Sequence, residues 1–166
     1  MIQENKDSNK PLDATQYNTL FIRSEQGKHK NEHISNLIDI LTNNNNKDIR
    51  HDALATLRNS NGIELLLEAI GKTKDKEKKQ KLIAACWESG INCSNYLSIF
   101  VGLAINEDYS GCLDCMTVIE DMTGPFNKTN LDDSKKKLLK WMGVADVKNE
   151  KRPLLQNILN IVSGFE

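Results

Sequence analysis

Two cysteines, Cys112 and Cys115, are separated by two residues, a spacing that can serve zinc binding or thiol exchange. A closed structural zinc site needs four ligands, and the other two cysteines, Cys86 and Cys93, have six residues between them rather than the usual two to four. Cys112 and Cys115 also share one apolar helical stripe with Met116. Because buried free cysteine packs as a small apolar residue, we expect core packing here, with metal binding or redox chemistry as the alternative.

The other groups that could do chemistry are scattered. His29 and His33 are four residues apart and would share a helix face, but no third ligand is near them, and the remaining histidine is His51. No Ser, Cys or Thr nucleophile is recognisably paired with a base, and no glycine-rich phosphate loop follows a strand. We therefore expect no catalytic residue, no cofactor and no metal, and a protein that is not an enzyme.

A lysine-rich stretch at residues 72–81 could contact phosphate or an acidic partner. Asp75 and Glu77 lie within it and weaken its positive field, and no aromatic side chain accompanies it for base stacking. We expect a solvated turn that leads into a helix. The shorter lysine run at residues 135–137 is interpreted in the same way.

Charge balance, hydropathy and cysteine content favour a soluble protein whose partners bind particular parts of its surface. The chain has 22 basic and 23 acidic residues, so no net field draws it to nucleic acid or to anionic lipid. No apolar run approaches the roughly 18–20 residues of a membrane span, and the first seven residues lack the pattern of a secretory signal. Four cysteines in a chain of 166 residues do not require disulfides. We expect a cytoplasmic protein without a membrane partner.

An apolar stripe with helical spacing returns about every thirty residues between residues 32 and 122. One helix pair cannot bury such a stripe alone, whereas stacking on the next pair buries it. The sequence therefore predicts an all-α fold, a short α-solenoid of three to four stacked antiparallel helix pairs. The three copies of the stripe are Ile34, Leu37, Ile38 and Leu41; Ile63, Leu66, Leu67 and Ile70; and Leu97, Phe100, Val101, Ala104 and Ile105.

Residues that favour helix caps and helix ends set the expected boundaries of the helices. Residues 1–30 are expected to be a mostly mobile segment, with one short capping helix over 13–23 as an alternative. Residues 31–166 form one domain, with helix pairs near 32–59, 62–90 and 94–122 and a C-terminal capping pair at 131–164. The expected signals are an N-cap at Asn46, a capping box at residues 61–64, a stop at Gly90, an N-cap at Ser94 and a first-turn proline at Pro153. We assign Leu138, Leu139, Trp141, Leu154, Leu155, Ile158 and Phe165 to shielding the C-terminal end.

Residues 49–57 read Ile-Arg-His-Asp-Ala-Leu-Ala-Thr-Leu. This succession resembles the opening of the second helix in HEAT-type repeats, which are similar to armadillo repeats. The second pair departs from the pattern, because Lys78 and Lys79 stand where Ile49 and Arg50 would align. The resemblance implies an extended ridged surface that binds other macromolecules through its row of second helices, and it implies that Arg50 bonds within the stack.

On this basis we expect a non-catalytic adaptor or scaffold that binds another protein of unknown identity. Trp87 lies one residue off the apolar stripe of its helix, so we expect it to be half exposed, and tryptophan is favoured at binding hot spots. The alternative is a nucleic-acid-binding or DNA-processing protein, glycosylase-like, or a lyase on the same scaffold. The expected partner face comprises His51, Arg58, Lys81, Trp87, Glu88, Asp114, Thr117 and Asp121.

Overall fold

The computed structural model describes residues 30–165, and this part of the chain is all helical, with eight α-helices, one 3-10 turn and no strand. The predicted all-α class is therefore confirmed for these residues. The elements are α2 (Lys30–Asn43), α3 (Lys47–Asn59), α4 (Ile63–Lys72), α5 (Lys76–Glu88), η1 (Ser94–Tyr96), α6 (Leu97–Asn106), α7 (Tyr109–Glu120), α8 (Lys128–Val144) and α9 (Arg152–Gly164).

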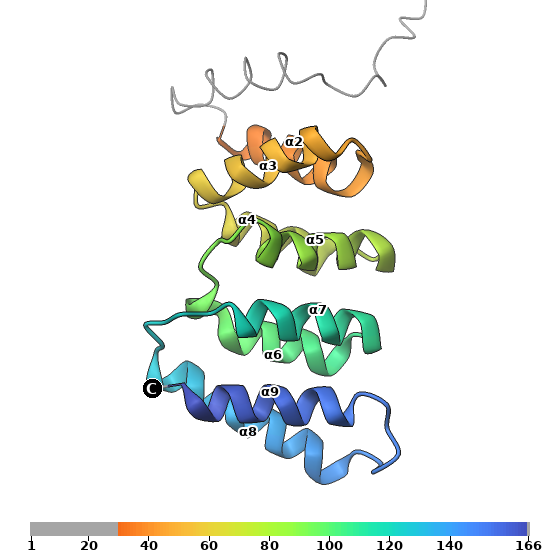
Figure 1. The fold of residues 1–166 in the computed structure, drawn as a ribbon, viewed down its shortest axis with the longest axis vertical. Helices are drawn as coiled ribbons and strands as arrows, with labels where there is room; N and C mark the ends of the chain where they lie inside the picture. Colours follow the sequence, from red (N-terminus) through yellow and green to blue (C-terminus); the bar gives the residue numbers. More distant parts are fainter. Residues whose placement is uncertain (1–29, 166) are drawn as a thin grey trace, which may run out of the picture.

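The helices form layers along the longest axis of the molecule (Figure 1). Each layer holds two helices that are consecutive in the chain: α2 with α3, α4 with α5, α6 with α7, and α8 with α9. Neighbouring layers touch through α2 and α5, through α5 and α7, and through α6 and α8. The last layer also packs α9 against α7. Contacts thus join each layer to the next one along the chain.

Several helix ends follow the predicted signals. Asn46 caps α3, and its side-chain oxygen accepts the backbone N–H of Asp48 at 2.9 Å and of Ile49 at 3.3 Å. Gly90 follows the end of α5 with a φ of +66°, a left-handed conformation that glycine adopts without steric cost. Pro153 lies in the first turn of α9, where its missing N–H has no helical partner to lose.

Two predicted caps are wrong. Gly62 caps α4 without a side-chain hydrogen bond, and Glu64 does not form a capping box, because its carboxylate accepts the hydroxyl proton of Tyr96 at 3.0 Å. Ser94 begins the 3-10 turn η1 instead of capping α6. Its hydroxyl oxygen accepts the N–H of Gly124 at 3.0 Å. Both side chains are engaged by residues about thirty positions away, which local sequence patterns do not reveal.

The core is one continuous apolar cluster that runs through all the layers. Its largest fully buried side chains include Leu37, Leu57, Leu66, Leu82 and Phe100. Within the C-terminal layer, most of the residues assigned to shielding the end are buried or half-buried, namely Leu138, Trp141, Leu154, Leu155, Ile158 and Phe165.

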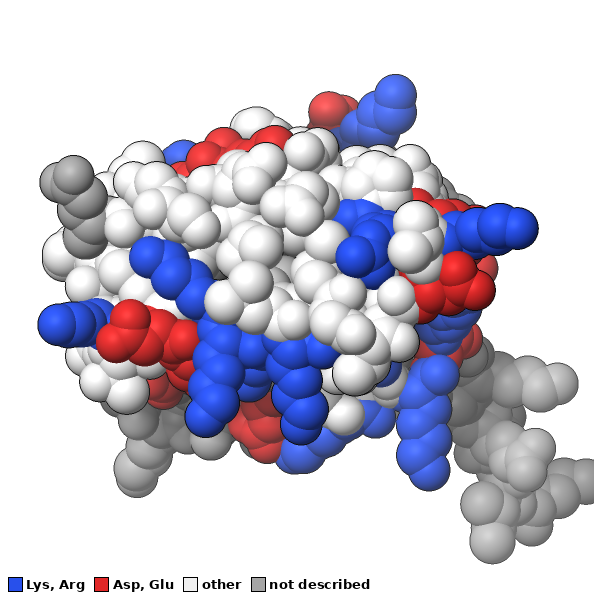
Figure 2. Space-filling view, turned by 90° about the horizontal axis from the view of Figure 1, so that it is seen from below, with Lys and Arg blue, Asp and Glu red and all other residues white. Residues whose placement is uncertain are grey.

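Leu139 is the exception in the C-terminal layer, because its side chain is 60 % exposed. Figure 2 looks at this end of the molecule, where lysine and arginine side chains gather along one edge of a broad area of uncharged residues. The C-terminal layer thus shields the core while leaving part of its own apolar surface in water.

The expectations for residues 1–29, including a helix over 13–23, lie outside the described residues. Among the described helices, none combines the length and the apolar character that crossing a membrane would require.

Two neighbouring residues on α6 test the core. Phe100 is fully buried, whereas Ile99 is 47 % exposed. We expect Phe100→Ala to lower the free energy of unfolding by about 3–5 kcal/mol, because the removed ring leaves a cavity. The matched variant Ile99→Ala should cost less than about 1 kcal/mol. Urea unfolding followed by circular dichroism measures both, and equal losses would contradict the packing of α6.

Candidate functional site

The predicted partner face divides into exposed and half-buried residues. The exposed members lie on or directly after the second helices of three successive layers. Lys81, Asp114 and Thr117 are half-buried. The exposed members are His51 and Arg58 on α3, Trp87 and Glu88 on α5, and Asp121 directly after α7.

Several members of this face have partners within the molecule, and two of these contacts join layers through charged side chains. Glu88 forms an ion pair with Arg50, which joins α5 to α3 and also donates to the carbonyl of Leu41 at 2.6 Å. Lys81 donates to the carbonyl of Thr42 at 3.3 Å, at the end of α2. Arg50 therefore bonds between layers, as predicted. Because Glu88 and Lys81 hold neighbouring layers together, their charges are less available to a partner than those of His51 and Arg58.

Asp114 lies where α7 faces α5. Burial is the largest influence on this carboxyl and raises its pKa above the usual range for aspartate, and the negative charge of Glu88 adds to the increase. Contact with the side chain of Gln80 opposes the shift. An ionised carboxylate is thus held at some energetic cost between two layers.

The structure adds two residues that the sequence analysis did not select. Tyr109 and Leu113 lie on α7 and are 45 % and 40 % exposed. Leu113 follows the buried Cys112 by one residue, so the helical phase that singled out Trp87 would also have pointed to it. The helices α5 and α7 pack against each other. Trp87 near the end of α5 and Tyr109 and Leu113 in the first half of α7 each leave apolar atoms in water, and we call these three residues the α5–α7 face.

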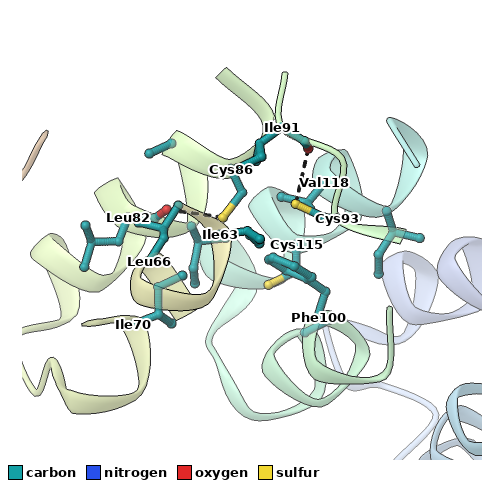
Figure 3. Close-up of a cluster of buried hydrophobic side chains, with 14 of the residues drawn as sticks. Ile63, Leu66, Ile70, Leu82, Cys86, Ile91, Cys93, Phe100, Cys115 and Val118 are labelled. Atoms are coloured by element: carbon teal, nitrogen blue, oxygen red, sulfur yellow. Dashed lines mark hydrogen bonds between the residues drawn. The ribbon is translucent and has the colours of Figure 1, made fainter. Parts of the chain in front are cut away.

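The cysteines belong to the core, as Cys112 and Cys115 were predicted to do. All four thiols are free and buried. Figure 3 shows Cys86, Cys93 and Cys115 among apolar side chains, with Cys86 donating to the carbonyl of Leu82 at 3.6 Å and Cys93 to that of Ile91 at 3.4 Å. The described residues contain no group of three or more His, Cys, Asp or Glu side chains placed to hold a metal ion.

The thiol pKa values follow from this environment. Burial raises the pKa of Cys112 to about 11 and raises that of Cys115 still further. For Cys86 the hydrogen bond with Cys93 is the largest cause of an increase in pKa, and burial comes second. Since the thiolate is the reactive form, these groups are poor nucleophiles near neutral pH.

The lysine-rich stretch is largely paired with acidic side chains. Its ion pairs either stay within one helix or cross from α5 to the turn before α7, where Lys79 lies 3.1 Å from the Glu107 carboxylate. The stretch is thus part of the bonding between layers as well as a solvated surface, and its field is partly neutralised. The pairs are Lys72 with Glu68, Lys76 with Asp108, Lys79 with Glu107, and Lys81 with Glu77.

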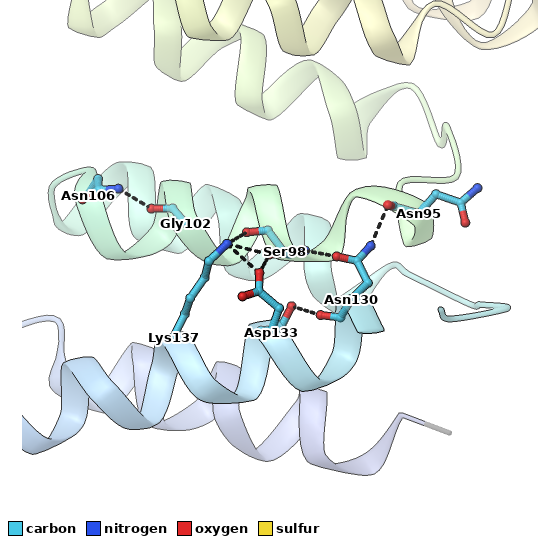
Figure 4. A network of polar contacts seen from close by, with 8 residues as sticks. Asn95, Ser98, Gly102, Asn106, Asn130, Asp133 and Lys137 are labelled. Carbon is cyan, nitrogen blue, oxygen red and sulfur yellow. Dashed lines mark hydrogen bonds and ion pairs between the residues drawn. The ribbon is translucent and has the colours of Figure 1, made fainter. Parts of the chain in front are cut away.

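A second polar network joins α6 to α8 (Figure 4). The side-chain amide of Asn130 donates to the carbonyl of Asn95 at 2.7 Å, and its oxygen accepts the N–H of Ser98 at 3.2 Å. Asp133 accepts the hydroxyl proton of Ser98 and pairs with Lys137 at 2.8 Å. An open polar hollow of about 640 Å³ adjoins Asn130 and Asp133. These groups are committed to holding two helices together.

Comparison of the chain with family models, with curated proteins and with solved structures finds no match.

Thiol labelling tests the buried cysteines. At pH 8 the native protein should react with iodoacetamide at Cys112 at least about 100-fold more slowly than the unfolded protein. The reason is that an increase in pKa from about 9 to about 11 lowers the fraction of reactive thiolate about 100-fold. Mass spectrometry after a timed quench gives the rate at each cysteine. Rapid modification of the native protein would contradict the burial of these thiols.

Replacing the Asp114 carboxylate tests its unfavourable setting. A raised pKa in the folded state makes the folded protein bind the proton more tightly than the unfolded protein does. The resulting stabilisation is therefore present below the unfolded pKa of about 3.9 and is lost as pH rises through the folded pKa. We expect Asp114→Asn to raise Tm at pH 7, with the gain shrinking at acid pH. Thermal melts across pH measure it, and Asp121→Asn, an exposed matched control, should change stability by less than about 0.5 kcal/mol.

Proposed function

We propose that this chain is a short α-solenoid of stacked antiparallel helix pairs, similar to HEAT repeats, and that it acts as a non-catalytic module that binds another protein. The α5–α7 face carries the proposal, because it presents aromatic and aliphatic side chains in water on the second helices. Trp87 is 37 % exposed, and tryptophan and tyrosine are the residues most enriched at binding hot spots.

The spacing of the polar contacts supports the repeat architecture. Bonds that cross from one layer to the next join residues separated by about one helix pair in the sequence. The separation is 38 residues for Arg50 with Glu88, 28 for Lys79 with Glu107, and 32 for Tyr96 with Glu64. Contact between nearest neighbours alone is what a solenoid requires.

The charge of the surface favours a protein partner over a polyanion. Arg58 and His51 share the outer side of α3 with the acidic Asp52, and all three are exposed. Nucleic-acid binding relies on an uninterrupted positive surface, whereas mixed charge around apolar anchors is typical of protein interfaces. The ion pairs of the lysine-rich stretch also favour a protein partner, because they reduce the positive field of that stretch.

Site-specific photocrosslinking tests the proposal. A photoreactive amino acid placed at Trp87 or at Leu113 should capture the same partner in an extract of the cells that produce the protein. The matched position Asp132, exposed on α8, should not capture it. Once the partner is known, Trp87→Ala should weaken its binding about tenfold or more. Equal capture at all three positions would count against the α5–α7 face, and tight, salt-sensitive binding of duplex DNA would favour a nucleic-acid-binding function.

A further inference from the structure

A separate apolar groove of about 340 Å³ runs between α6 and α8. It lies between first helices of two layers, whereas the α5–α7 face lies on second helices. Its volume is at the low end of the range for ligand pockets, which suits a bulky side chain better than a whole cofactor. The groove is lined by Gly102, Ile105 and Asn106 on α6 and by Lys137, Lys140, Trp141 and Val144 on α8.

The walls of the groove are apolar and partly in water. Ile105 and Trp141 pack against the core from one side and are only partly buried. Val144 is 80 % exposed. At Gly102 a side chain would meet nothing within 4 Å, so open space lies above this point of α6. An apolar side chain from another molecule could therefore cover these atoms without displacing any of them.

The rim of the groove is positively charged. Lys137 is held by an ion pair with Asp133 and by donation to the carbonyl of Ser98 at 3.3 Å (Figure 4). Lys140, one helical turn further along α8, has neither an ion pair nor a hydrogen bond within residues 30–165. None of the groove's lining residues is acidic. Among the described residues, the ammonium group of Lys140 thus has no carboxylate to balance it, and it lies beside an apolar surface.

We propose that the α6–α8 groove binds a segment of a partner protein in which a bulky apolar side chain stands next to a carboxylate. The apolar side chain covers Gly102, Ile105 and Trp141. The carboxylate pairs with Lys140, which the partly apolar surroundings make a stronger partner than a lysine in open water. Shape and charge complementarity therefore select the same kind of segment. This surface is distinct from the α5–α7 face, so either proposal can fail without the other.

A short peptide of alternating leucine and glutamate, blocked at both ends, serves as the probe. The chain contains two tryptophans, so Trp87→Phe leaves Trp141 as the only indole, and its emission reports on the groove. Adding the peptide should shift the Trp141 emission to shorter wavelength with a saturable dependence on concentration. The corresponding peptide of leucine and lysine should produce no saturable shift.

Two variants in this background test the two parts of the groove. Gly102→Leu should fill the open space and weaken binding at least about tenfold, while the fold is kept because leucine favours the helix interior over glycine. Lys140→Glu should have a similar effect by reversing the charge. The matched controls are Gly71→Leu, a helical glycine on α4 with equally open surroundings, and Lys74→Glu, an exposed lysine before α5. Both controls should bind the acidic peptide like the parent protein.

Four results would overturn the proposal. The first is no saturable shift with the acidic peptide at millimolar concentration. The second is equal binding of the acidic and basic peptides. The third is binding that either Gly102→Leu or Lys140→Glu leaves unchanged. The fourth is displacement of the peptide by sodium decanoate at equal concentration, which would assign the groove to an anionic hydrocarbon chain. Circular dichroism of each variant confirms that a loss of binding is not a loss of fold.

Discussion

The burial of apolar side chains between successive helix layers is the constraint on which the rest of this structure depends. A pair of short helices buries too little surface to offset the conformational entropy lost on ordering it. Each layer is therefore stable only with a neighbour, and the continuous core from Leu37 to Val162 reflects this dependence. The outer surfaces of the helices take no part in this packing, so their side chains are not constrained by the core.

Polar side chains fix how the layers are placed relative to one another. Apolar contact is not directional, but a hydrogen bond to the end of a neighbouring helix is. Arg50 and Lys81 both donate to carbonyls at the end of α2, where backbone oxygens lack helical partners. Because of these bonds, charged residues on the second helices differ in their contacts. Glu88 and Lys81 join layers, whereas Arg58 and His51 remain exposed to solvent.

Much of the fold could be predicted from local patterns, because helix periodicity and end signals are local properties. The bounds of α3 and its cap at Asn46 are examples, as is the stop at Gly90. Glu64 and Ser94 were assigned to caps and instead bond to Tyr96 and Gly124, which only tertiary structure brings near. The candidate site was also predicted only in part. The half-exposed Trp87 follows from helical phase. The α6–α8 groove instead depends on the distance between two helices that have α7 between them in the chain, and no sequence pattern encodes that distance.

Lys151 shows how deeply the last layer is integrated. Its ammonium group, just before α9, donates to the carbonyls of Ile105 and Glu107 at 2.7 Å and 2.6 Å and approaches that of Ala104 at 3.4 Å. These oxygens belong to the end of α6 and the turn that follows it, in the preceding layer. The helix layers are therefore not interchangeable. A truncated chain that ends after α7 would lose this cation. The carbonyl oxygens would then accept hydrogen bonds from water or from another molecule, so removal of the last helix layer would expose a new binding surface.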